Sequence, residues 1–415
     1  MKVLAMIVEY NPFHLGHKYH LEYSKSITGA NYSIALMSGS FVQRGEPSLV
    51  DKWTKTKMAI DNGVDLVIEL PFIFATQSAE LFAFGGIALL NSINIVNYIS
   101  FGSELGDLNI LKEIANILVI EPPFFKEKLK EYLSLGNSYV VSRSNALIDY
   151  YNTLKETSIN PNDIKEILKM SNNILAIEYL KSLQILNSSI KPITIKRIGS
   201  SYKEDNLNNK ISSATAIRKT LFSKSIDATK KYLTNSSYNH LVNYINNYNN
   251  FNTLDNYAQI IHYLLRIDNG NPLKEIMDVE TGLDNRILDK SYKYKDIGEL
   301  VEESSTKRYT KTRIQRILIH LMAGLDKTTF NELMCHYPSY IRVLGANDKG
   351  MFLLKKIKEK SNIPIITKFP HYKKYSDPYL DKTISFDKKS TDLYFLGIDS
   401  FSMNMDYYTS PYIKN

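Results

Sequence analysis

The chain opens with the apolar run Val3-Leu4-Ala5-Met6-Ile7-Val8, then Glu9-Tyr10-Asn11-Pro12-Phe13, and then His14-Leu15-Gly16-His17. The apolar run is typical of a buried strand of a parallel sheet, and Asn11-Pro12 predicts a turn after it. The HxGH segment predicts the start of a helix. Backbone N–H groups at a helix N-terminus that follows a parallel strand bind phosphate. We therefore expect a site for a nucleoside triphosphate, ATP, at the end of this first strand.

The residues up to 101 repeat this alternation of strand and helix. Strands are predicted at 2–8, 32–37, 65–70 and 95–101, and helices from residue 16, at 52–62 and at 78–91. Strands separated by helices form parallel sheets. The predicted fold is therefore α/β, a Rossmann-like doubly wound parallel sheet whose ligand binds at the carboxyl ends of the strands.

The pattern changes in the second half of the chain. Residues 105–190 are predicted to be mostly helical, a further strand is expected at 193–198, and a loop leads into a helix near residue 214. Beyond 222 the pattern predicts helices and only one strand, at 364–367. We therefore predict two domains: residues 1–222 bind ATP, and residues 223–415 form a mainly helical, basic region.

Composition limits the class of protein. The 415 residues are 44% hydrophobic and include one cysteine, Cys335, and no apolar run long enough to span a bilayer. We therefore expect a soluble, cytoplasmic protein without disulfides, a Cys-based zinc site or a membrane partner. The net charge is +8, and residues 301–415 carry 19 Lys/Arg against 12 Asp/Glu. This excess suits a nucleic acid, although a solvated lysine-rich surface explains it equally well.

His14 and His17 are three residues apart, so they share one face of a helix that begins here. Imidazoles in this position donate hydrogen bonds to phosphate oxygens and stabilise charge as an α-phosphate is attacked. Gly16 leaves room for a phosphate beside the backbone. The alternatives are a chance HxxH and a metal cluster that also includes His20. The metal cluster is disfavoured because no Glu stands next to His14.

A second candidate phosphate segment is Ser213-Ala214-Thr215-Ala216-Ile217-Arg218. It places hydroxyl groups at a predicted helix N-terminus and Arg218 one turn into the helix. Ser213, Thr215 and Arg218 together suit the outer phosphates of ATP. Taken alone, the segment is an ordinary helix N-cap.

The HxGH segment and the late Ser213 to Arg218 segment resemble the nucleotidylyltransferase superfamily, although Ala214 stands where a second hydroxyl is usual. A closer resemblance rests on longer segments: Val8-Glu9-Tyr10-Asn11-Pro12-Phe13-His14, Met37-Ser38-Gly39, Gln43-Arg44-Gly45-Glu46-Pro47, Lys52-Trp53, Thr56-Lys57-Met58-Ala59, Asp65-Leu66-Val67-Ile68-Glu69-Leu70-Pro71 and Phe101-Gly102-Ser103-Glu104. These segments resemble the bacterial tRNA(Met) cytidine acetate ligase family. The resemblance recurs at 172–175, 197 and 214–218 and, more thinly, at 343–345 and 364–368.

This resemblance implies an enzyme that activates acetate with ATP as acetyl-adenylate and transfers the acetyl group to N4 of the wobble cytidine of elongator tRNA(Met). It also implies that residues 223–415 bind the tRNA. It implies that His14, His17 and Arg218 act in catalysis, with Mg²⁺ accompanying ATP and no metal held by the protein alone. The implied ATP contacts are Ile7, Val8, Glu9, Tyr10, Asn11, Pro12, Phe13, His14, Leu15, Gly16, His17, Lys18, Tyr19, His20, Gly102, Asn172 and Arg197. Ser213 and Thr215 join them from their position at a helix start.

Other charged residues lie close to the expected site in the topology. Arg44, Lys52 and Lys57 are expected to bind phosphate, the acetate carboxylate or tRNA, whereas Lys55 is expected on a solvated helix face. Two carboxylates, Glu9 and Glu104, follow strands that end at the same crevice. They contact either a ribose or metal-bound water, or else hydrogen-bond to the adjacent loop.

The C-terminal region contains a candidate RNA-binding helix. Basic residues recur there at helical spacing and predict a helix whose basic side lies along a phosphate backbone: Lys307, Arg308, Lys311, Arg313 and Arg316. Two other classes remain open. A plain adenylyltransferase acting on a small phosphorylated metabolite would leave this region without a role. A non-catalytic RNA-binding protein would not need the pair of histidines.

Overall fold

The computed structural model describes residues 1–415 except 155–158, 198–211, 399, 401 and 415. Its central sheet has the strand order β10-β8-β5-β2-β1-β6-β7, and β9 pairs with β8 beside this path. The strands are β1 (Val3–Val8), β2 (Tyr32–Ser38), β5 (Leu66–Leu70), β6 (Tyr98–Ser103), β7 (Lys191–Lys196), β8 (Ile341–Asn347), β9 (Ile365–Ile366) and β10 (Tyr412–Lys414). A separate hairpin consists of β3 (Phe41–Val42) and β4 (Glu46–Pro47).

The predicted α/β fold with a parallel sheet is confirmed. β1 pairs in parallel with β2 on one side and with β6 on the other, so that Val3 lies opposite Tyr32 and Leu4 opposite Tyr98. β5 and β7 continue the sheet in the same orientation. Most residues of β1, β2 and β5 are buried because helices pack against the sheet, which is why these strands are continuous apolar runs.

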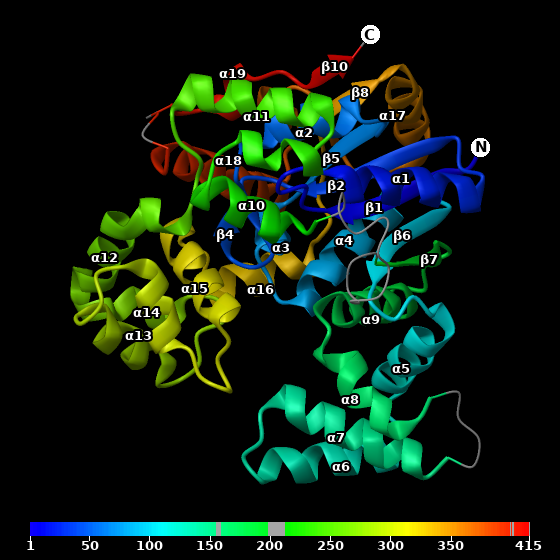
Figure 1. The fold of residues 1–415 in the computed structure, drawn as a ribbon, viewed down its shortest axis with the longest axis vertical. Helices are drawn as coiled ribbons and strands as arrows, with labels where there is room; N and C mark the ends of the chain where they lie inside the picture. The colour runs from blue at the N-terminus through cyan, green and yellow to red at the C-terminus, as the bar shows by residue number, and fades with distance from the viewer. Residues whose placement is uncertain (155–158, 198–211, 399, 401, 415) are drawn as a thin grey trace.

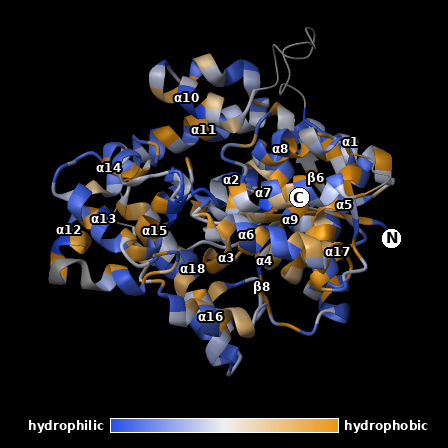
Figure 2. Ribbon diagram, turned by 90° about the horizontal axis from the view of Figure 1, so that it is seen from below, coloured by the Kyte–Doolittle hydropathy of each residue, from blue (hydrophilic) through white to orange (hydrophobic). Residues whose placement is uncertain are grey.

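Helices α1 (Leu15–Thr28), α2 (Lys52–Asp61), α4 (Ala79–Ile93), α9 (Ser171–Ile185) and α17 (Asp348–Lys360) pack against these strands, and α3 (Phe72–Ala75) leads from β5 to α4. In Figure 2 the hydrophobic residues of α4 lie in the middle of the molecule, whereas α10 (Ala214–Ser223) and α11 (Asn235–Tyr248) stand at its edge. Across the part of the chain that the structure describes, no helix is long and apolar enough to cross a membrane.

Two groups of helices project from the sheet (Figure 1). One comprises α5 (Leu108–Ile120), α6 (Pro123–Ser134), α7 (Tyr139–Asn152) and α8 (Pro161–Lys169), which confirms the helical prediction for 105–190. The other is a lobe of α12 (Ala258–Arg266), α13 (Leu283–Ser291), α14 (Ile297–Ser304) and α15 (Lys311–Ala323). The chain then continues through α16 (Lys327–Cys335), α18 (Pro378–Leu396) and α19 (Met405–Tyr408).

The C-terminal part also contributes strands. β8 lies antiparallel to β5, β10 lies parallel to β8, and the predicted strand at 364–367 is present as β9. The sequence pattern missed β8 because Arg342 and Gly345 interrupt its apolar run. The sheet therefore crosses the predicted boundary at residue 222, and the region beyond it is not purely helical. The assignment of residues 223–415 to tRNA binding stays a prediction.

Candidate nucleotide site

Three parallel strands end together at one edge of the sheet. His14 follows β1, Gly102 lies in β6 and Arg197 follows β7. The backbone N–H of Arg197 donates to the carbonyl of Ser103 at 2.9 Å, which fixes the end of β7 beside β6. A Cβ at Gly102 would lie 3.2 Å from Cγ of Arg197, so glycine leaves the space that the arginine side chain occupies. The structure thus brings three of the predicted ATP contacts to one place.

The two histidines of the HxGH segment form the N-cap of α1. Nδ1 of His14 accepts a hydrogen bond from the N–H of Gly16 at 3.0 Å, and Nδ1 of His17 accepts one from the N–H of His14 at 3.4 Å. The two rings stack with centroids 3.7 Å apart. Because each Nδ1 is an acceptor, the proton of each neutral imidazole resides on Nε2. Both rings therefore present an Nε2–H donor, which is what a phosphate oxygen requires.

The histidines at the site are neutral. Burial, and then the charge of Arg197, lowers the pKa of His14 to about 3. Burial also lowers the pKa of His17 well below its usual value, with smaller contributions from His14, His20 and Arg197. Burial, and then the charge of Arg197, lowers the pKa of His20 to about 4. Nε2 of His20 hydrogen-bonds to Ser100 Oγ at 2.8 Å.

We expect this neutrality to make the protein sensitive to acid. The unfolded chain binds a proton at His14 near pH 6.5, whereas the folded chain does so only near pH 3, so stability falls as the pH drops below 6.5. His14 alone should cost about 2 kcal/mol of unfolding free energy at pH 5 relative to pH 7.5. Asn does not titrate, so the drop in unfolding free energy between pH 7.5 and pH 5 should be smaller in His14→Asn than in the wild type by about this amount. Urea unfolding of both proteins at both pH values measures the difference. Equal losses in the two proteins would contradict the lowered pKa.

The turn before the histidines is anchored by aromatic burial. Tyr10 has a left-handed φ of 48°, and the side chains of Tyr10 and Phe13 are buried. The ring of Tyr10 lies edge-on to Phe13 at 4.7 Å and to His17 at 5.0 Å. Oδ1 of Asn11 accepts a hydrogen bond from the N–H of Leu49 at 2.7 Å. These contacts hold the turn in one conformation and with it the direction of the imidazoles.

The other predicted contacts within 7–20 lie on two elements. Ile7 and Val8 end β1, and Leu15 begins α1. Lys18 pairs with Glu22 along the helix at 3.8 Å. Tyr19 is exposed and stacks on Tyr23, so it lies on the solvent side of α1.

Asn172 is tied to the same edge of the sheet through Glu104. Oε1 of Glu104 accepts from Nδ2 of Asn172 at 2.6 Å, and Oε2 accepts from the backbone N–H of Asn173 at 2.9 Å. The carboxylate thus caps the N-terminus of α9, where negative charge is stabilised by the helix dipole. Of the two interpretations of Glu104, the structure favours hydrogen bonding within the protein.

Arg218 reaches the turn from α10. Its guanidinium donates to the carbonyl of Asn11 at 3.0 Å and pairs with Glu46 at 3.1 Å. Ser213 is the N-cap of α10 and accepts from the N–H of Ala216 at 3.2 Å, and Thr215 is exposed on the first turn. The helix start predicted here is confirmed, and its arginine lies against the turn that precedes the histidines.

Lys55, expected on a solvated face, is completely buried below the turn. Its ammonium donates to the carbonyls of Ser38 at 2.7 Å, Gly39 at 2.9 Å and Glu9 at 3.2 Å. Burial lowers its pKa to about 7, although the neighbouring carboxylates oppose this shift. Lys55 therefore joins the carboxyl ends of β1 and β2. Apart from the position of Lys55 in α2, no feature of the sequence indicates this role.

Glu9 connects the site to the hairpin of β3 and β4. Its carboxylate accepts a hydrogen bond from the N–H of Gln43 at 2.9 Å. Burial raises the pKa of Glu9, whereas this hydrogen bond and the charges of Arg44, Lys55 and Arg218 lower it. The structure shows the loop contact that was one of the two interpretations of this carboxylate.

The three cations predicted to contact substrate occupy different places. Lys52 is buried, and its ammonium pairs with Glu69 at 2.9 Å and Asp406 at 2.8 Å, which favours a structural role, and its substrate contact stays a prediction. Lys57 is exposed two positions after Lys55 and points away from the face of α2 that meets the strand ends. Arg44 is exposed at the hairpin tip, where a nitrogen of its guanidinium lies 3.5 Å from Ser171 Oγ, next to Asn172. Only Arg44 remains close to the site.

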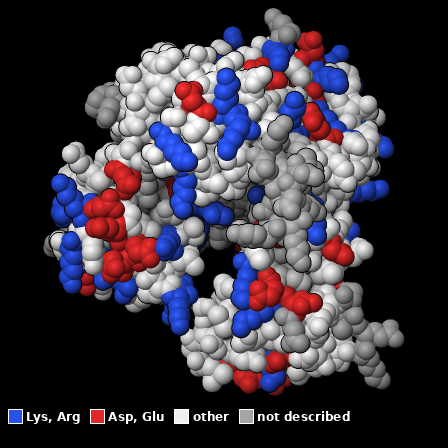
Figure 3. Space-filling view, viewed as in Figure 1, with Lys and Arg blue, Asp and Glu red and all other residues white. Residues whose placement is uncertain are grey.

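Four of the five basic residues that were expected to lie along a phosphate backbone form ion pairs with acidic side chains, and their binding of RNA stays a prediction. Figure 3 shows acidic and basic side chains side by side over the lobe of α12 to α15. The ion pairs are Arg308 with Glu280, Lys311 with Glu302, Arg313 with Glu280, and Arg316 with Asp278. Helical spacing predicted the helix but could not show that acidic residues from other segments neutralise it.

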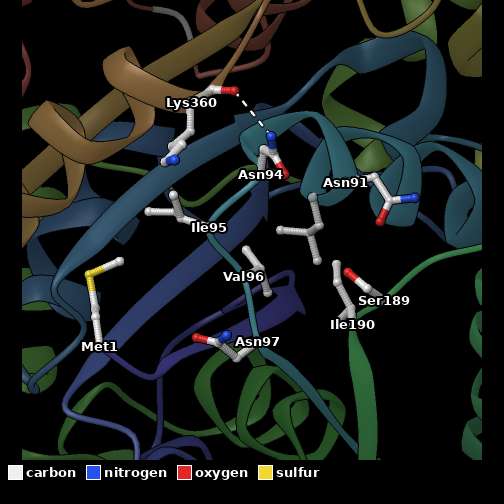
Figure 4. A pocket seen from close by; sticks show the side chains of 10 residues that line it. Met1, Asn91, Asn94, Ile95, Val96, Asn97, Ser189, Ile190 and Lys360 are labelled. Atoms are coloured by element: carbon white, nitrogen blue, oxygen red, sulfur yellow. Dashed lines mark hydrogen bonds between the residues drawn. The ribbon is translucent and has the colours of Figure 1, made fainter.

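Among the described residues, no group of three or more His, Cys, Asp or Glu could hold a metal ion. A cavity lies at the opposite end of the sheet from the histidines. Figure 4 shows this cavity, of about 320 Å³, at the amino ends of β1, β6 and β7. Its lining consists of apolar and amide side chains and the hydroxyl of Ser189, and among the described residues Lys360 is the one charged side chain in it. Asn94 donates to the carbonyl of Lys360 at 3.2 Å.

The fold and the paired Nε2–H donors at the end of β1 define a nucleotidyl transferase of the HxGH type. A sequence model of the family described as HIGH Nucleotidyl Transferase matches residues 1–407. Two relatives named tRNA(Met) cytidine acetate ligase, from Thermoanaerobacter sp. (strain X514) and Clostridium perfringens (strain SM101 / Type A), are 47% and 45% identical over 100% of both chains. The crystal structure of Thermotoga maritima TmcAL bound with alpha-thio ATP superposes with a TM-score of 0.93 at 32% identity, covering 100% of each chain. The chain belongs to the tRNA(Met) cytidine acetate ligase family.

Proposed function

We propose that this chain activates acetate with ATP, forming acetyl-adenylate and pyrophosphate, and transfers the acetyl group to N4 of the wobble cytidine of elongator tRNA(Met). The observation that carries the proposal is the pair of backbone-oriented imidazoles at the end of β1, in a chain that matches tRNA(Met) cytidine acetate ligases over its full length. The relative crystallised with alpha-thio ATP supports ATP as the nucleotide. The reaction is proposed to occur in the cytoplasm, where ATP and tRNA are found.

In the first step an acetate oxygen attacks the α-phosphorus, and the bond to the leaving pyrophosphate oxygen breaks. Negative charge builds up on the α-phosphate and the pyrophosphate. The Nε2–H groups of His14 and His17 donate to these oxygens, and Arg197 and Arg218 supply fixed positive charge beside them. Removing one preorganised donor of this kind typically lowers the rate by about 10²–10³-fold.

In the second step the exocyclic amine of cytidine attacks the acetyl carbonyl carbon. The bond to the AMP oxygen breaks, AMP leaves, and the amine loses one proton to solvent water. AMP leaves with its phosphate on the same imidazole donors, so one set of groups serves both steps. The imidazoles of His14 and His17 cannot accept that proton at Nδ1, since a backbone N–H already occupies each Nδ1.

Mg²⁺ is proposed to arrive with the triphosphate. The described residues offer no cluster of three His, Cys, Asp or Glu to hold it, and Mg²⁺ in phosphoryl-transfer sites is commonly held in large part by substrate phosphates and water. When bound, it would neutralise phosphate charge. The residues of this chain orient the α-phosphate by hydrogen bonds and by the charges of the two arginines.

The proposal is tested with purified protein, ATP and labelled acetate, with and without elongator tRNA(Met). We expect acetate-dependent exchange between ATP and pyrophosphate without tRNA, and N4-acetylcytidine only when the tRNA is present. Pyrophosphate release that requires a phosphorylated metabolite instead of acetate would favour the plain adenylyltransferase. Complete absence of nucleotide turnover, with tRNA still bound, would favour a non-catalytic RNA-binding protein.

A further inference from the structure

A second hollow lies beside the nucleotide site and has no role in the chemistry described so far. It is a cleft of about 750 Å³ between α10, the β3–β4 hairpin and the lobe of α12 to α15. Its volume lies within the range of ligand pockets and accommodates a nucleotide. We call it the α10 cleft.

Two arginines that line the α10 cleft also contact residues next to the nucleotide site. Arg218 lines the cleft and also donates to the carbonyl of Asn11, in the turn before the histidines. Arg44 lines the cleft from the hairpin and lies 3.5 Å from Ser171, which adjoins Asn172. A molecule seated in the cleft therefore lies next to the point where an acyl-adenylate would form.

Positive charge available to a partner lies on the α10 wall of this cleft, in addition to Arg44 on the hairpin wall. Lys219 lines the cleft, is exposed and, within the described residues, has no ion-pair partner. Beyond it, exposed Lys224, Lys230 and Lys231 surround a further hollow of about 580 Å³ on the neighbouring face of α10. On the opposite wall, Lys311 is paired with Glu302. Figure 3 shows Lys and Arg side chains gathered over α10 at the edge of the hollow.

The same wall carries an exposed aromatic ring. Phe222 is 51% exposed and lines the cleft one turn after Arg218. Its ring is supported edge-on by Phe251, with centroids 6.5 Å apart. Exposed aromatic rings between cations serve as stacking platforms for unpaired bases, because every base has an aromatic face.

We propose that the α10 cleft binds single-stranded RNA, the loop of the acceptor tRNA that presents the cytidine. Phe222 stacks on a base and Lys219 contacts an adjacent phosphate in the cleft, while Lys224, which lines the neighbouring hollow, contacts a phosphate of the strand that leaves the cleft. This inference rests on the proposed function for the identity of the RNA. The inference assigns RNA binding to the lysines of α10, which have no ion pair within the described residues, and not to the ion-paired cations of α15.

The test measures tRNA binding separately from the first chemical step. We expect Lys219→Glu with Lys224→Glu to raise the Kd for an elongator tRNA(Met) transcript by roughly tenfold or more, and to lower its salt dependence by about one to two phosphate contacts. Phe222→Ala should raise the Kd by roughly tenfold with an unchanged salt dependence. Acetate-dependent ATP–pyrophosphate exchange without tRNA should remain at the wild-type rate in these variants.

The matched control is Lys355→Glu with Lys358→Glu, which makes the same change of charge on exposed lysines of α17. It should leave tRNA binding unchanged. Wild-type affinity in the α10 variants, or an equal loss in the α17 control, would overturn the assignment of the cleft. A wild-type protein without acetate-dependent exchange would instead contradict the proposed function, and the binding comparison would still decide whether the cleft holds RNA.

Discussion

His14→Asn should lose acetate-dependent ATP–pyrophosphate exchange by about 10²–10³-fold at pH 7.5, because it removes one preorganised donor to the α-phosphate. The loss should not come from unfolding. Asn is a preferred N-cap residue, and its Oδ1 can accept the N–H of Gly16 as Nδ1 of His14 does. Exchange kinetics measured beside urea unfolding at the same pH check both parts of the expectation.

The matched variant is His14→Gln, which keeps a hydrogen-bond donor near the α-phosphate but loses the helix cap. Its amide nitrogen can donate from about the position of Nε2, but it no longer caps α1. We expect exchange within about tenfold of wild type and a loss of about 1 kcal/mol in unfolding free energy. Wild-type exchange in His14→Asn together with a large loss in His14→Gln would mean that the cap, and not the donor, is what the reaction needs.

The part of the site that could be predicted from the sequence is the part encoded locally. The apolar run, the turn and the capping histidines lie within residues 3–17, and their geometry follows from a strand end and a helix start. Gly102 and Arg197 were predicted through the family resemblance, and they meet because β1, β6 and β7 are parallel neighbours. Register in a parallel sheet brings such strand ends together without any further signal in the sequence.

The part that could not be predicted depends on partners far away in the chain. Helical spacing showed that Arg313 and Arg316 share a face, but not that Asp278 and Glu280 lie opposite them. Lys55 was expected in solvent because a lysine is rarely buried, and only the convergence of three carbonyls explains its place. Long-range pairing of this kind arises from the topology, which local periodicity does not encode.

Lys52→Met should lower the free energy of unfolding by about 3–5 kcal/mol, because it removes the cation from a buried cluster of charges. The ammonium lies 2.9 Å from Glu69 and 2.8 Å from Asp406, and Asp406 also pairs with the buried Arg342 at 3.3 Å. Asp406 and Glu69 outweigh the cost of burial and raise the pKa of Lys52, so its ammonium stays charged in the fold. Without it, two carboxylates from β5 and α19 face each other with Arg342 as the remaining cation of the cluster.

Lys57→Met is the control, since it makes the same change five positions later on α2 at an exposed side chain that has no ion pair within the described residues. It should change the unfolding free energy by no more than about 0.5 kcal/mol. The comparison separates the two interpretations of Lys52. A substrate contact would raise the KM for acetate or ATP and leave stability unchanged, whereas the buried cluster predicts lost stability and, in the fraction that stays folded, an ordinary KM. We expect lost stability and an ordinary KM in Lys52→Met, because the contacts of Lys52 with β5 and α19 join the C-terminal segment to the sheet.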